Sequence, residues 1–515
     1  MPSLPAIAAF FCVLLPWLNP FSPGPTSAVG PYLFAGLCAG LLLLALAAHP
    51  RQGRDTELLR AVVAGWLVAA LLSALIGLLQ YFQATGPFGV WLNHTELGEA
   101  FGNLRQRNQF ASLIHIGLAA LIGLYLIDEA DANAGVRWRL GWPGAAAAAV
   151  LLGVANAASS SRTGLMQLLL LVLLALWWRH GGPAGRARQA LWLVLLALAA
   201  FALASLALPL AAGLDPLNSG AWARLRAGDP ACASRLTLWG NVLHLIAQRP
   251  WLGWGWGELD YAHFITLYPG ARFCDILDNA HNLPLHLAVE LGLPVAVLAC
   301  LALVIGLWRA RPWRERQPAR QMAWAILAVI GLHSLLEYPL WYGPFQIATL
   351  LALWLLCWLP KAPESFQPPR GLGSFGFVAQ YSQALAAILI IALVGLSAWD
   401  YQRASQIYLA PEERSAAYQT DTLAKTRSVW LFQDQVRFAE LTLSDVTLEN
   451  AHSMREQALE MLHFSPEVRV VERILDAALL LHQDNALAYF AARYQAAFPD
   501  DYARWAGRNK AHAVH

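Results

Sequence analysis

Three arginines stand in polar turns beside long apolar segments of the sequence. Arg162 follows three serines in the turn Ser159–Gly164, and Arg105 and Arg107 lie just before another apolar segment. The guanidinium group is a rigid fork of donors that fits phosphate oxygens, and a charge at membrane depth is costly and usually functional. These positions indicate binding of a phosphorylated ligand, with snorkelling to lipid phosphate as the alternative.

A histidine lies where a long polar loop meets the next apolar segment, in the run DNAHNLPLH at residues 278–286. Proline is tolerated only in the first turn of a helix, so Pro284 predicts that His281 and Asn282 stand at a helix N-terminus. That end of a helix attracts anions and disfavours a protonated imidazole, and a neutral imidazole can accept a proton. The motif therefore predicts a general base beside an anion site, with a purely capping histidine as the alternative.

Further polar residues occur near the ends of apolar segments. Arg235 opens an expected amphipathic helix, and His286 and Glu290 share a helix face at a spacing of four. We expect these two either to form a buried hydrogen-bonded pair or to belong to a proton or substrate path. Glu337 and Tyr338 end another apolar segment, where the carboxylate could steady an arginine or the acceptor, or form a simple ion pair.

Several motifs of transferases and hydrolases are absent from the sequence. It has no Asp-x-Asp, no His-Glu-x-x-His, no Cys-x-x-Cys and no Walker loop. This disfavours a nucleotide-sugar or metal-hydrolase mechanism, and we expect no metal and no cofactor. The net charge of +2, with no basic run, gives no indication of a nucleic-acid partner.

The composition identifies the elements that must position these residues. Hydrophobic residues make up 57% of the chain and charged residues 13%, against about 25% charged in soluble domains. Roughly 20 apolar residues cross a bilayer as a helix. We therefore predict an all-α polytopic membrane protein of about eleven transmembrane helices, the first being a retained helix rather than a cleaved signal. The expected spans are 4–20, 30–48, 60–80, 109–127, 143–158, 163–178, 190–212, 283–308, 321–337, 343–359 and 379–399.

Basic residues predict the orientation of these spans. One set of alternate short loops carries fifteen Lys and Arg residues, and the opposite set carries only Arg105, Arg107 and Arg162. Since basic loops stay in the cytoplasm, the N-terminus is expected inside and the C-terminus outside. The three arginines and the histidine motif then lie at the non-cytoplasmic surface.

Two larger pieces are also expected outside. One is the loop 213–282 of a membrane domain 1–399, and the other is the tail 400–515, whose apolar spacing predicts a soluble domain of four to six helices. Cys232 and Cys274 share the loop, in a compartment where disulfides persist. We expect them to form a disulfide that stiffens the segment carrying Arg235 and the approach to His281.

Taken in order along the chain, several motifs resemble one family. They are the Gln106–Gln109 segment, the Ser160–Gly164 turn, the Arg235–Trp239 helix, the Trp251–Gly255 turn and, above all, the 278–286 run. They resemble the O-antigen ligase/polymerase superfamily of Gram-negative bacteria over roughly residues 60–360. The resemblance is greatest to its protein O-oligosaccharyltransferase branch, which glycosylates type IV pilins and other envelope proteins.

The resemblance implies a metal-independent, inverting glycosyl transfer at the periplasmic face of the inner membrane. The donor would be an undecaprenyl-diphosphate-linked glycan, and the acceptors Ser or Thr hydroxyls of a periplasmic protein such as pilin. Arg162 and Arg235 would hold the pyrophosphate, and His281 would act as the base or position the acceptor hydroxyl. Arg105 and Glu337 match no family position closely. The candidate substrate-binding residues are Gln106, Arg107, Asn279, Asn282, Arg105, Glu337 and Tyr338.

Three other functions stay open. An O-antigen polymerase would use the same donor with a glycan acceptor, although such an acceptor needs no soluble docking tail. A ligase would transfer the glycan to lipid A core. A lipid or solute transporter would favour internal repeats and broken helices at the membrane midplane, and the sequence shows no clear repeat.

Overall fold

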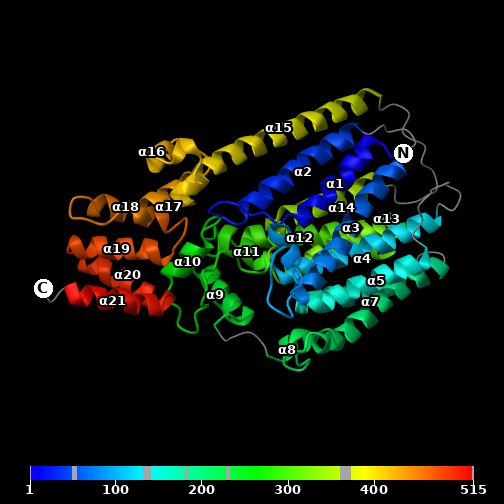
Figure 1. The fold of residues 1–515 in the computed structure, drawn as a ribbon, viewed down its shortest axis with the longest axis horizontal. Helices are drawn as coiled ribbons and strands as arrows, with labels where there is room; N and C mark the ends of the chain where they lie inside the picture. The colour runs from blue at the N-terminus through cyan, green and yellow to red at the C-terminus, as the bar shows by residue number, and fades with distance from the viewer. Residues whose placement is uncertain are drawn as a thin grey trace. The chain divides into compact units, whose positions relative to one another are not determined.

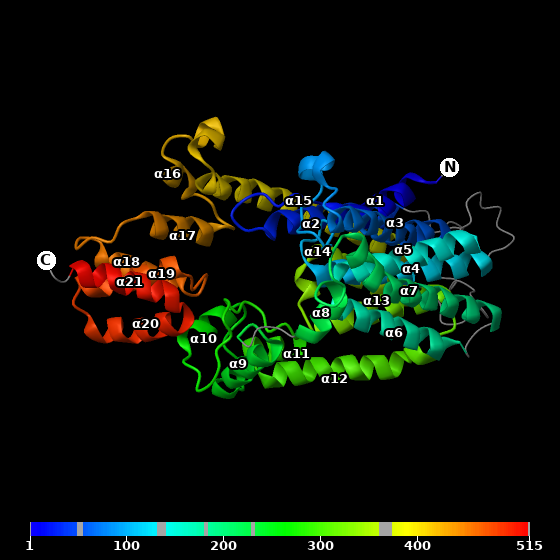
Figure 2. The ribbon, with the colours of Figure 1, turned by 60° about the horizontal axis from the view of Figure 1, so that its bottom comes forward.

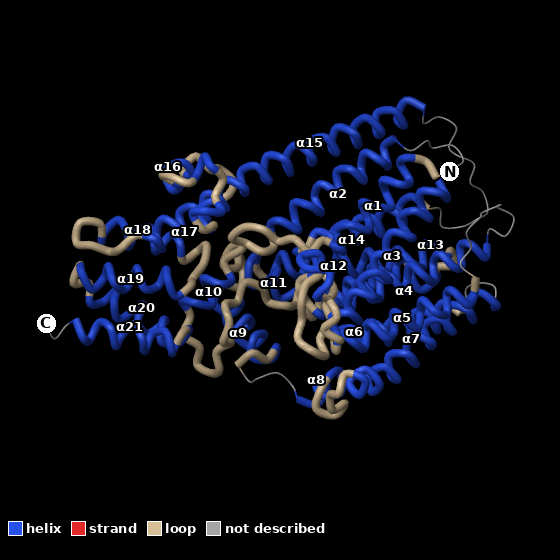
Figure 3. The backbone as a smooth tube through the Cα atoms, in the orientation of Figure 1, coloured by secondary structure: helices blue, strands red, loops and turns tan. Residues whose placement is uncertain are grey.

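The computed structural model describes residues 2–48, 55–130, 141–179, 184–227, 232–359 and 373–512. Every regular element in these ranges is a helix (Figure 3). They form two compact units. The first unit is Met1–Ala227 with Leu307–Leu396, and the second is Gly228–Gly306 with Ser397–His515. The sequence-based division at residue 399 did not anticipate that the outer loop and the tail would belong to one unit.

The first unit holds most of the apolar helices. Its elements are α1 (Leu4–Leu18), α2 (Val29–Ala48), α3 (Asp55–Tyr81), η1 (Gly86–Trp91), α4 (Arg107–Ala130), α5 (Trp142–Ser159), α6 (Arg162–Trp178), α7 (Ala184–Ala211), α8 (Gly220–Ala227), η2 (Pro312–Arg314), α13 (Pro318–Ser334), η3 (Pro339–Trp341), α14 (Gly343–Trp358) and most of α15 (Gly373–Ser405).

Each predicted span coincides with one of these helices or, at 283–308, with helices of the second unit. Seven described helices are long and apolar enough to cross a membrane, in α2, α3, α4, α5, α7, α12 and α15, while α1, α6 and α14 are shorter apolar helices. The chain is therefore a multi-pass membrane protein. The number of eleven spans and the orientation of the termini stay predictions. Among the basic loop residues, Arg51, Arg54, Arg137, Arg139, Lys361 and Arg370 lie outside the described residues.

Small residues let the helices of the first unit pack closely, as is common in membranes. A Cβ on Gly153 of α5 would come within 2.3 Å of the Ala197 carbonyl oxygen on α7. A Cβ on Gly117 of α4 would come within 2.1 Å of the Ala70 Cβ on α3. Figure 2 shows α3, α4, α5 and α7 as neighbouring, nearly parallel helices. This packing fixes the position of α4, whose first residue is the predicted Arg107.

The second unit joins the outer loop to the tail. Its elements are α9 (Arg235–Gln248), α10 (Leu259–Ile265), α11 (Leu283–Leu291), α12 (Leu293–Ala310, most of it), η4 (Gln406–Tyr408), η5 (Pro411–Glu413), η6 (Ala416–Tyr418), α16 (Thr422–Thr426), α17 (Gln433–Leu443), α18 (Ala451–Met461), α19 (Val468–Leu480), α20 (Asp484–Ala497) and α21 (Pro499–His512).

The structure corrects the predicted span 283–308, which is two helices and not one. The chain breaks between α11 and α12 at Gly292, whose φ is +87°. A Cβ there would meet the Trp251 carbonyl oxygen at 2.2 Å, so only glycine fits. The candidate span is consequently α12, and His286 and Glu290 lie outside it, on α11.

The tail is helical as predicted, and α18 to α21 stack side by side (Figure 1). Their apolar core includes Leu441, Met454, Ile474 and Tyr494, and it also takes in Phe264 of α10, which is 2% exposed. A side chain of the outer loop is therefore part of the core of the tail.

Candidate functional site

Three of the predicted polar segments meet in the first unit. Helix α6 begins at Arg162 because Ser161 caps it, its Oγ accepting a hydrogen bond from the Gly164 N–H at 3.0 Å. The same hydroxyl donates to Asn108 Oδ1 at 2.6 Å, and Asn108 Nδ2 donates to Glu337 Oε1 at 3.1 Å. The turn before α6, the first turn of α4 and the segment after α13 are thus joined at Asn108.

A buried polar layer lies one turn further along the same helices. Gln167 Nε2 of α6 donates to Ser112 Oγ of α4 at 2.7 Å, and that oxygen lies 2.9 Å from His333 Nδ1 of α13. All three side chains are buried. The His333 carbonyl accepts the Glu337 N–H at 2.8 Å. Since buried hydrogen bonds between transmembrane helices fix their positions, this layer holds Glu337 and Asn108 in place.

The predicted residues before α4 mostly contact the protein itself. Gln106 Oε1 accepts the Gln109 N–H at 2.6 Å and caps α4, and Arg105, at φ +60°, donates to the Pro20 carbonyl at 2.6 Å. Arg107 forms an ion pair with Glu99. Both arginines thus contact the protein itself, an outcome that neither phosphate binding nor snorkelling anticipated, and their part in substrate binding stays a prediction. The Tyr338 ring stacks on that of Tyr342, with centroids 5.8 Å apart.

The histidine motif forms the predicted helix start in the second unit. Asn282 caps α11, with its Oδ1 accepting the Leu285 N–H at 3.1 Å, and Pro284 lies in the first turn. His281 has φ +50°, in the left-handed region, and its N–H donates to Asn279 Oδ1 at 2.9 Å. The two asparagines that were predicted to bind substrate therefore shape the turn that presents His281.

Helix α9 is tied to this turn through Trp239. Its Nε1 donates to the Ala280 carbonyl, next to His281, at 3.1 Å. Helix α9 begins at Arg235, as predicted, and Ser234 caps it by accepting the Thr237 N–H at 3.2 Å. Residues four apart share a helix face, so Arg235 stands one turn from Trp239 on the face that meets the histidine turn.

The Trp-Gly run supports α11 from its other end. The Trp254 N–H donates to the Val289 carbonyl at 2.8 Å, and the Gly255 N–H donates to the Glu290 carbonyl at 3.0 Å. A Cβ on Gly253, at φ +70°, would lie 2.3 Å from the Glu290 carbonyl oxygen, which explains this glycine. His286 Nε2 lies 3.4 Å from Glu290 Oε2, and both side chains are buried. The two side chains are therefore neighbours, as their spacing predicts, but Glu290 Oε2 accepts no hydrogen bond from the described residues, so the choice between a hydrogen-bonded pair and a proton or substrate path stays open.

Cys232 and Cys274 are joined by a disulfide, with their Cα atoms 5.2 Å apart. The bond links the segment before Arg235 to the segment before the histidine motif. Between them His263 is buried, with its Nδ1 2.8 Å from the Tyr268 hydroxyl and its Nε2 3.2 Å from the Phe273 carbonyl. Burial lowers the pKa of His263 to about 3, so this imidazole is neutral and structural.

Comparisons with known proteins agree with this arrangement of motifs. Residues 147–300 match the family described as O-antigen ligase, which spans Arg162, Arg235 and His281. Residues 100–126 match the family described as protein glycosylation ligase, which spans Asn108. Residues 321–512 match the C-terminal part of a family described as virulence factor membrane-bound polymerase.

Two curated proteins of Acinetobacter baylyi are similar to parts of the chain. The General O-oligosaccharyltransferase is 28% identical over 139 residues, which is 27% of this chain and 23% of that protein. The ComP-specific O-oligosaccharyltransferase is 24% identical over 115 residues, 22% of this chain and 21% of that protein. The matched stretches thus span less than a quarter of either relative.

The chain belongs to the O-antigen ligase superfamily. Within the superfamily its similarity is to the branch that glycosylates proteins. For this superfamily member, the structure adds Asn108, Ser161 and Trp239 to the residues that reasoning from the sequence selected. Asn108 stands directly after Arg107 in a motif that was already recognised, but its contact with Glu337, 229 positions away, has no local signal. Arg162 belongs to the first unit and Arg235 and His281 to the second, so the convergence of the three stays a prediction.

Proposed function

We propose that this superfamily member transfers a glycan from undecaprenyl diphosphate to Ser or Thr hydroxyls of periplasmic proteins such as type IV pilin. The observation that carries the proposal is the set of contacts at Asn108. Asn108, in the segment matched by the protein glycosylation ligase family, is hydrogen-bonded both to Glu337 and to Ser161, in the segment matched by the O-antigen ligase family. Ser161 directly precedes Arg162 at the N-terminus of α6. The names of the two curated relatives support a protein acceptor.

The reaction would be a single displacement with inversion at the sugar. The acceptor oxygen attacks the anomeric carbon, the bond from that carbon to the pyrophosphate oxygen breaks, and undecaprenyl diphosphate leaves. The hydroxyl proton passes to His281, or His281 orients the hydroxyl. Arg162 and Arg235 stabilise the charge that develops on the pyrophosphate, the kind of preorganised electrostatic effect that usually contributes most to catalysis.

The arrangement around each group fits its role. Arg162 is the first residue of α6, so the N–H groups of that helix end add to its attraction for an anion. His281 is held in a left-handed turn by Asn279 and by the capped start of α11, which limits the positions that its ring can adopt. We infer that this turn faces the periplasm, where the lipid-linked glycan and the acceptor protein meet.

The test is co-expression of the full chain with a lipid-linked glycan pathway and a candidate pilin, followed by intact-mass measurement of the pilin. A mass increase of one glycan on Ser or Thr, absent with Arg162→Lys, supports the proposal. Purified protein in detergent should turn over lipid-linked glycan without any gradient, which a transporter would not do. The rate should be unchanged by EDTA, and a rate that needs an added metal would contradict the metal-independent mechanism.

An O-antigen polymerase or a lipid A-core ligase is the second candidate. The match of residues 321–512 to a membrane-bound polymerase family favours the polymerase, and the match to the O-antigen ligase family favours the ligase. All three reactions share the donor, so the acceptor distinguishes them. Polymer on the lipid carrier, or glycan on lipid A core, with unmodified pilin in the same cells would replace the proposed function with one of these.

A further inference from the structure

An open apolar cavity lies at the end of α6 that is remote from Arg162. It has a volume of about 100 Å³ and lies between α4, α6, α7 and α13, all in the first unit. Its walls include Leu126, Leu171, Leu174, Val194 and Met322. Arg162 and Trp178 are the two ends of α6, so this cavity is separate from the candidate site.

Polar side chains gather at one edge of the cavity. Arg179, Arg316, Gln321 and Trp178 line it there, and both arginines are exposed. The Trp178 indole N–H donates to the Pro312 carbonyl at 2.9 Å, which fixes the ring at this edge. Tryptophan and arginine together are typical of the headgroup level of a bilayer, at the boundary of the hydrocarbon core.

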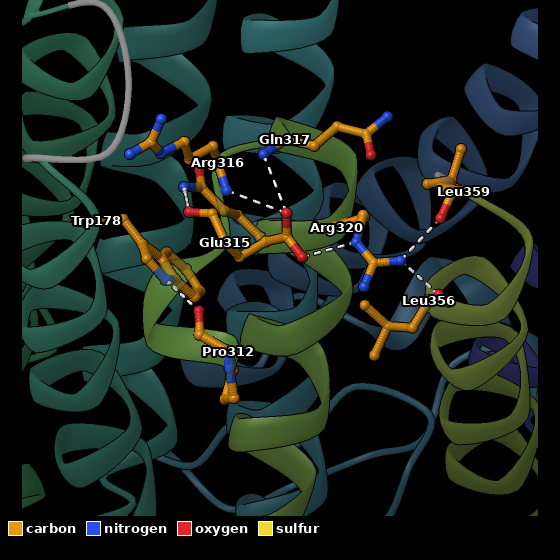
Figure 4. Close-up of polar contacts among 9 residues, drawn as sticks. Trp178, Pro312, Glu315, Arg316, Gln317, Arg320, Leu356 and Leu359 are labelled. Carbon is orange, nitrogen blue, oxygen red and sulfur yellow. Dashed lines mark hydrogen bonds and ion pairs between the residues drawn. The ribbon is translucent and has the colours of Figure 1, made fainter. Parts of the chain in front are cut away.

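The neighbouring acidic residue does not neutralise Arg316. Glu315 accepts hydrogen bonds from Arg320 Nε at 2.7 Å and from the Arg316 and Gln317 N–H groups at 3.0 and 3.3 Å. Figure 4 shows Glu315 turned toward Arg320, with the Arg316 side chain extending away from both on the side of Trp178. Among the described residues, the Arg316 guanidinium has no acidic partner, whereas Arg320 is buried in its ion pair.

We propose that this cavity binds one anionic phospholipid, with an acyl chain between α4, α6, α7 and α13 and the phosphate at Arg316 and Arg179. The apolar walls suit a hydrocarbon chain, and a guanidinium fork suits a phosphate. Basic pockets between transmembrane helices recognise anionic headgroups in this way. The proposal does not depend on the glycosyl transfer, since it concerns the opposite end of α6.

The experiment is native mass spectrometry of the detergent-solubilised full chain, titrated with phosphatidylglycerol or with phosphatidylcholine of the same acyl chains. We expect the first phosphatidylglycerol to bind roughly 25-fold more tightly than phosphatidylcholine, since each of the two arginines near the headgroup contributes about a fivefold preference. Arg179→Gln with Arg316→Gln should remove the preference. Arg314→Gln is the matched control, because Arg314 is exposed two residues away but does not line the cavity.

A second variant tests the apolar part. Ala175→Phe fills the cavity and leaves both arginines in place, so it should weaken binding of both lipids. Melting temperatures of the variants identify any that fail to fold. Equal binding of the two lipids, or an unchanged preference in the double arginine variant, would overturn the proposal. Displacement of the lipid by millimolar inorganic phosphate would also overturn it, because the site would then recognise the anion alone.

Discussion

Asn108 and Glu337 are joined by a hydrogen bond of 3.1 Å across 229 positions of the chain. The same amide accepts the Ser161 hydroxyl, which caps the helix that Arg162 begins. Asn108 thus links α4 both to the turn before Arg162 and to the segment that follows α13, one helical turn from the buried contacts of Ser112. Its two amide atoms are both used, one as donor and one as acceptor.

We therefore expect Asn108→Ala to lower the rate of transfer by roughly ten- to a hundredfold, because small misplacements of reacting groups are costly. Glu337→Gln keeps an oxygen acceptor for Asn108, so its rate of transfer should fall much less. An equally large fall in Glu337→Gln would show that the carboxylate charge itself acts on the substrate. The measurement is the initial rate of transfer at equal membrane level. Asn218→Ala, which removes an exposed amide in the same unit, is the control. A full rate in Asn108→Ala would make the contact incidental.

The disulfide gives a second prediction. Peptide mapping under non-reducing conditions should recover Cys232 and Cys274 as one linked pair, as the structure has them. By the chain-entropy relation, a bond closing a loop of this length contributes about 4 kcal/mol. The double variant Cys232→Ser, Cys274→Ser should therefore unfold at a lower temperature, and a protease should cleave it faster near Arg235 and His281. Both thiols found free in the native protein would contradict the pairing.

The stability of the outer loop should depend on pH through two groups, the buried His263 and the half-buried Asp260, whose pKa values shift in opposite directions. The folded pKa of His263, lowered by burial to about 3, lies below the usual 6.5. Its contribution to stability is present above pH 6.5 and is lost as the pH falls toward 3. Burial raises the pKa of Asp260 from 3.8 to about 7, so its contribution is present below pH 3.8 and is lost as the pH rises through 7.

Melting curves at pH 7.5 and pH 5.5 separate the two effects. His263→Gln removes the group whose protonation destabilises the fold at low pH. The melting temperature of this variant should therefore fall less than that of the wild type when the pH is lowered from 7.5 to 5.5. Asp260→Asn removes the group that stabilises the fold on acidification, so the melting temperature of this variant should fall more than that of the wild type over the same change of pH. The same change in melting temperature in all three proteins would show that neither group is coupled to folding.

Sequence reasoning identified the helices well, because long apolar runs and local capping rules determine them. Pro284 and Asn282 gave the start of α11 through rules that need only neighbouring residues. Gly292 and Pro294 are local signals of the break that the predicted span did not use, whereas the Trp251 carbonyl, whose approach requires glycine at 292, lies 41 positions earlier and has no local signal. The contact between Asn108 and Glu337 and the place of Phe264 in the core of the tail were missed for the same reason. Helical periodicity shows which face is apolar and not which element covers it.

The tail should hold the outer loop in place, in addition to any binding of an acceptor protein. Phe264 lies in its core, the Tyr261 and His463 rings stack 3.9 Å apart, and Arg493 Nε donates to the Ile265 carbonyl at 2.7 Å. Truncation near residue 400 should spare membrane insertion. It should nevertheless weaken transfer both to pilin and to a small hydroxyl acceptor, since the loop carrying Arg235 and His281 loses its support.

Phe264→Ala tests the same contact without truncation. Replacing a buried phenylalanine typically costs about 3–5 kcal/mol, so hydrogen exchange should accelerate in both α10 and the tail helices. Arg504→Gln, which breaks an exposed ion pair, should change little. If truncation abolishes transfer to pilin but spares the small acceptor, the tail serves docking alone.

The last prediction concerns the catalytic groups themselves. His281 has φ +50°, a conformation that asparagine tolerates better than alanine. His281→Asn therefore removes the imidazole with little backbone strain, and it should lower the rate by about 10²–10⁴-fold if His281 is the general base.

Arg162→Lys and Arg235→Lys complete that test, because an ammonium group keeps the charge and loses the bidentate fork. Both variants should be severely impaired, and His281→Asn should leave donor binding nearly intact while the arginine variants weaken it. The measurement pairs the transfer rate with binding of the lipid-linked glycan. Full activity in His281→Asn would leave the family assignment standing and make the histidine a residue that only shapes the start of α11.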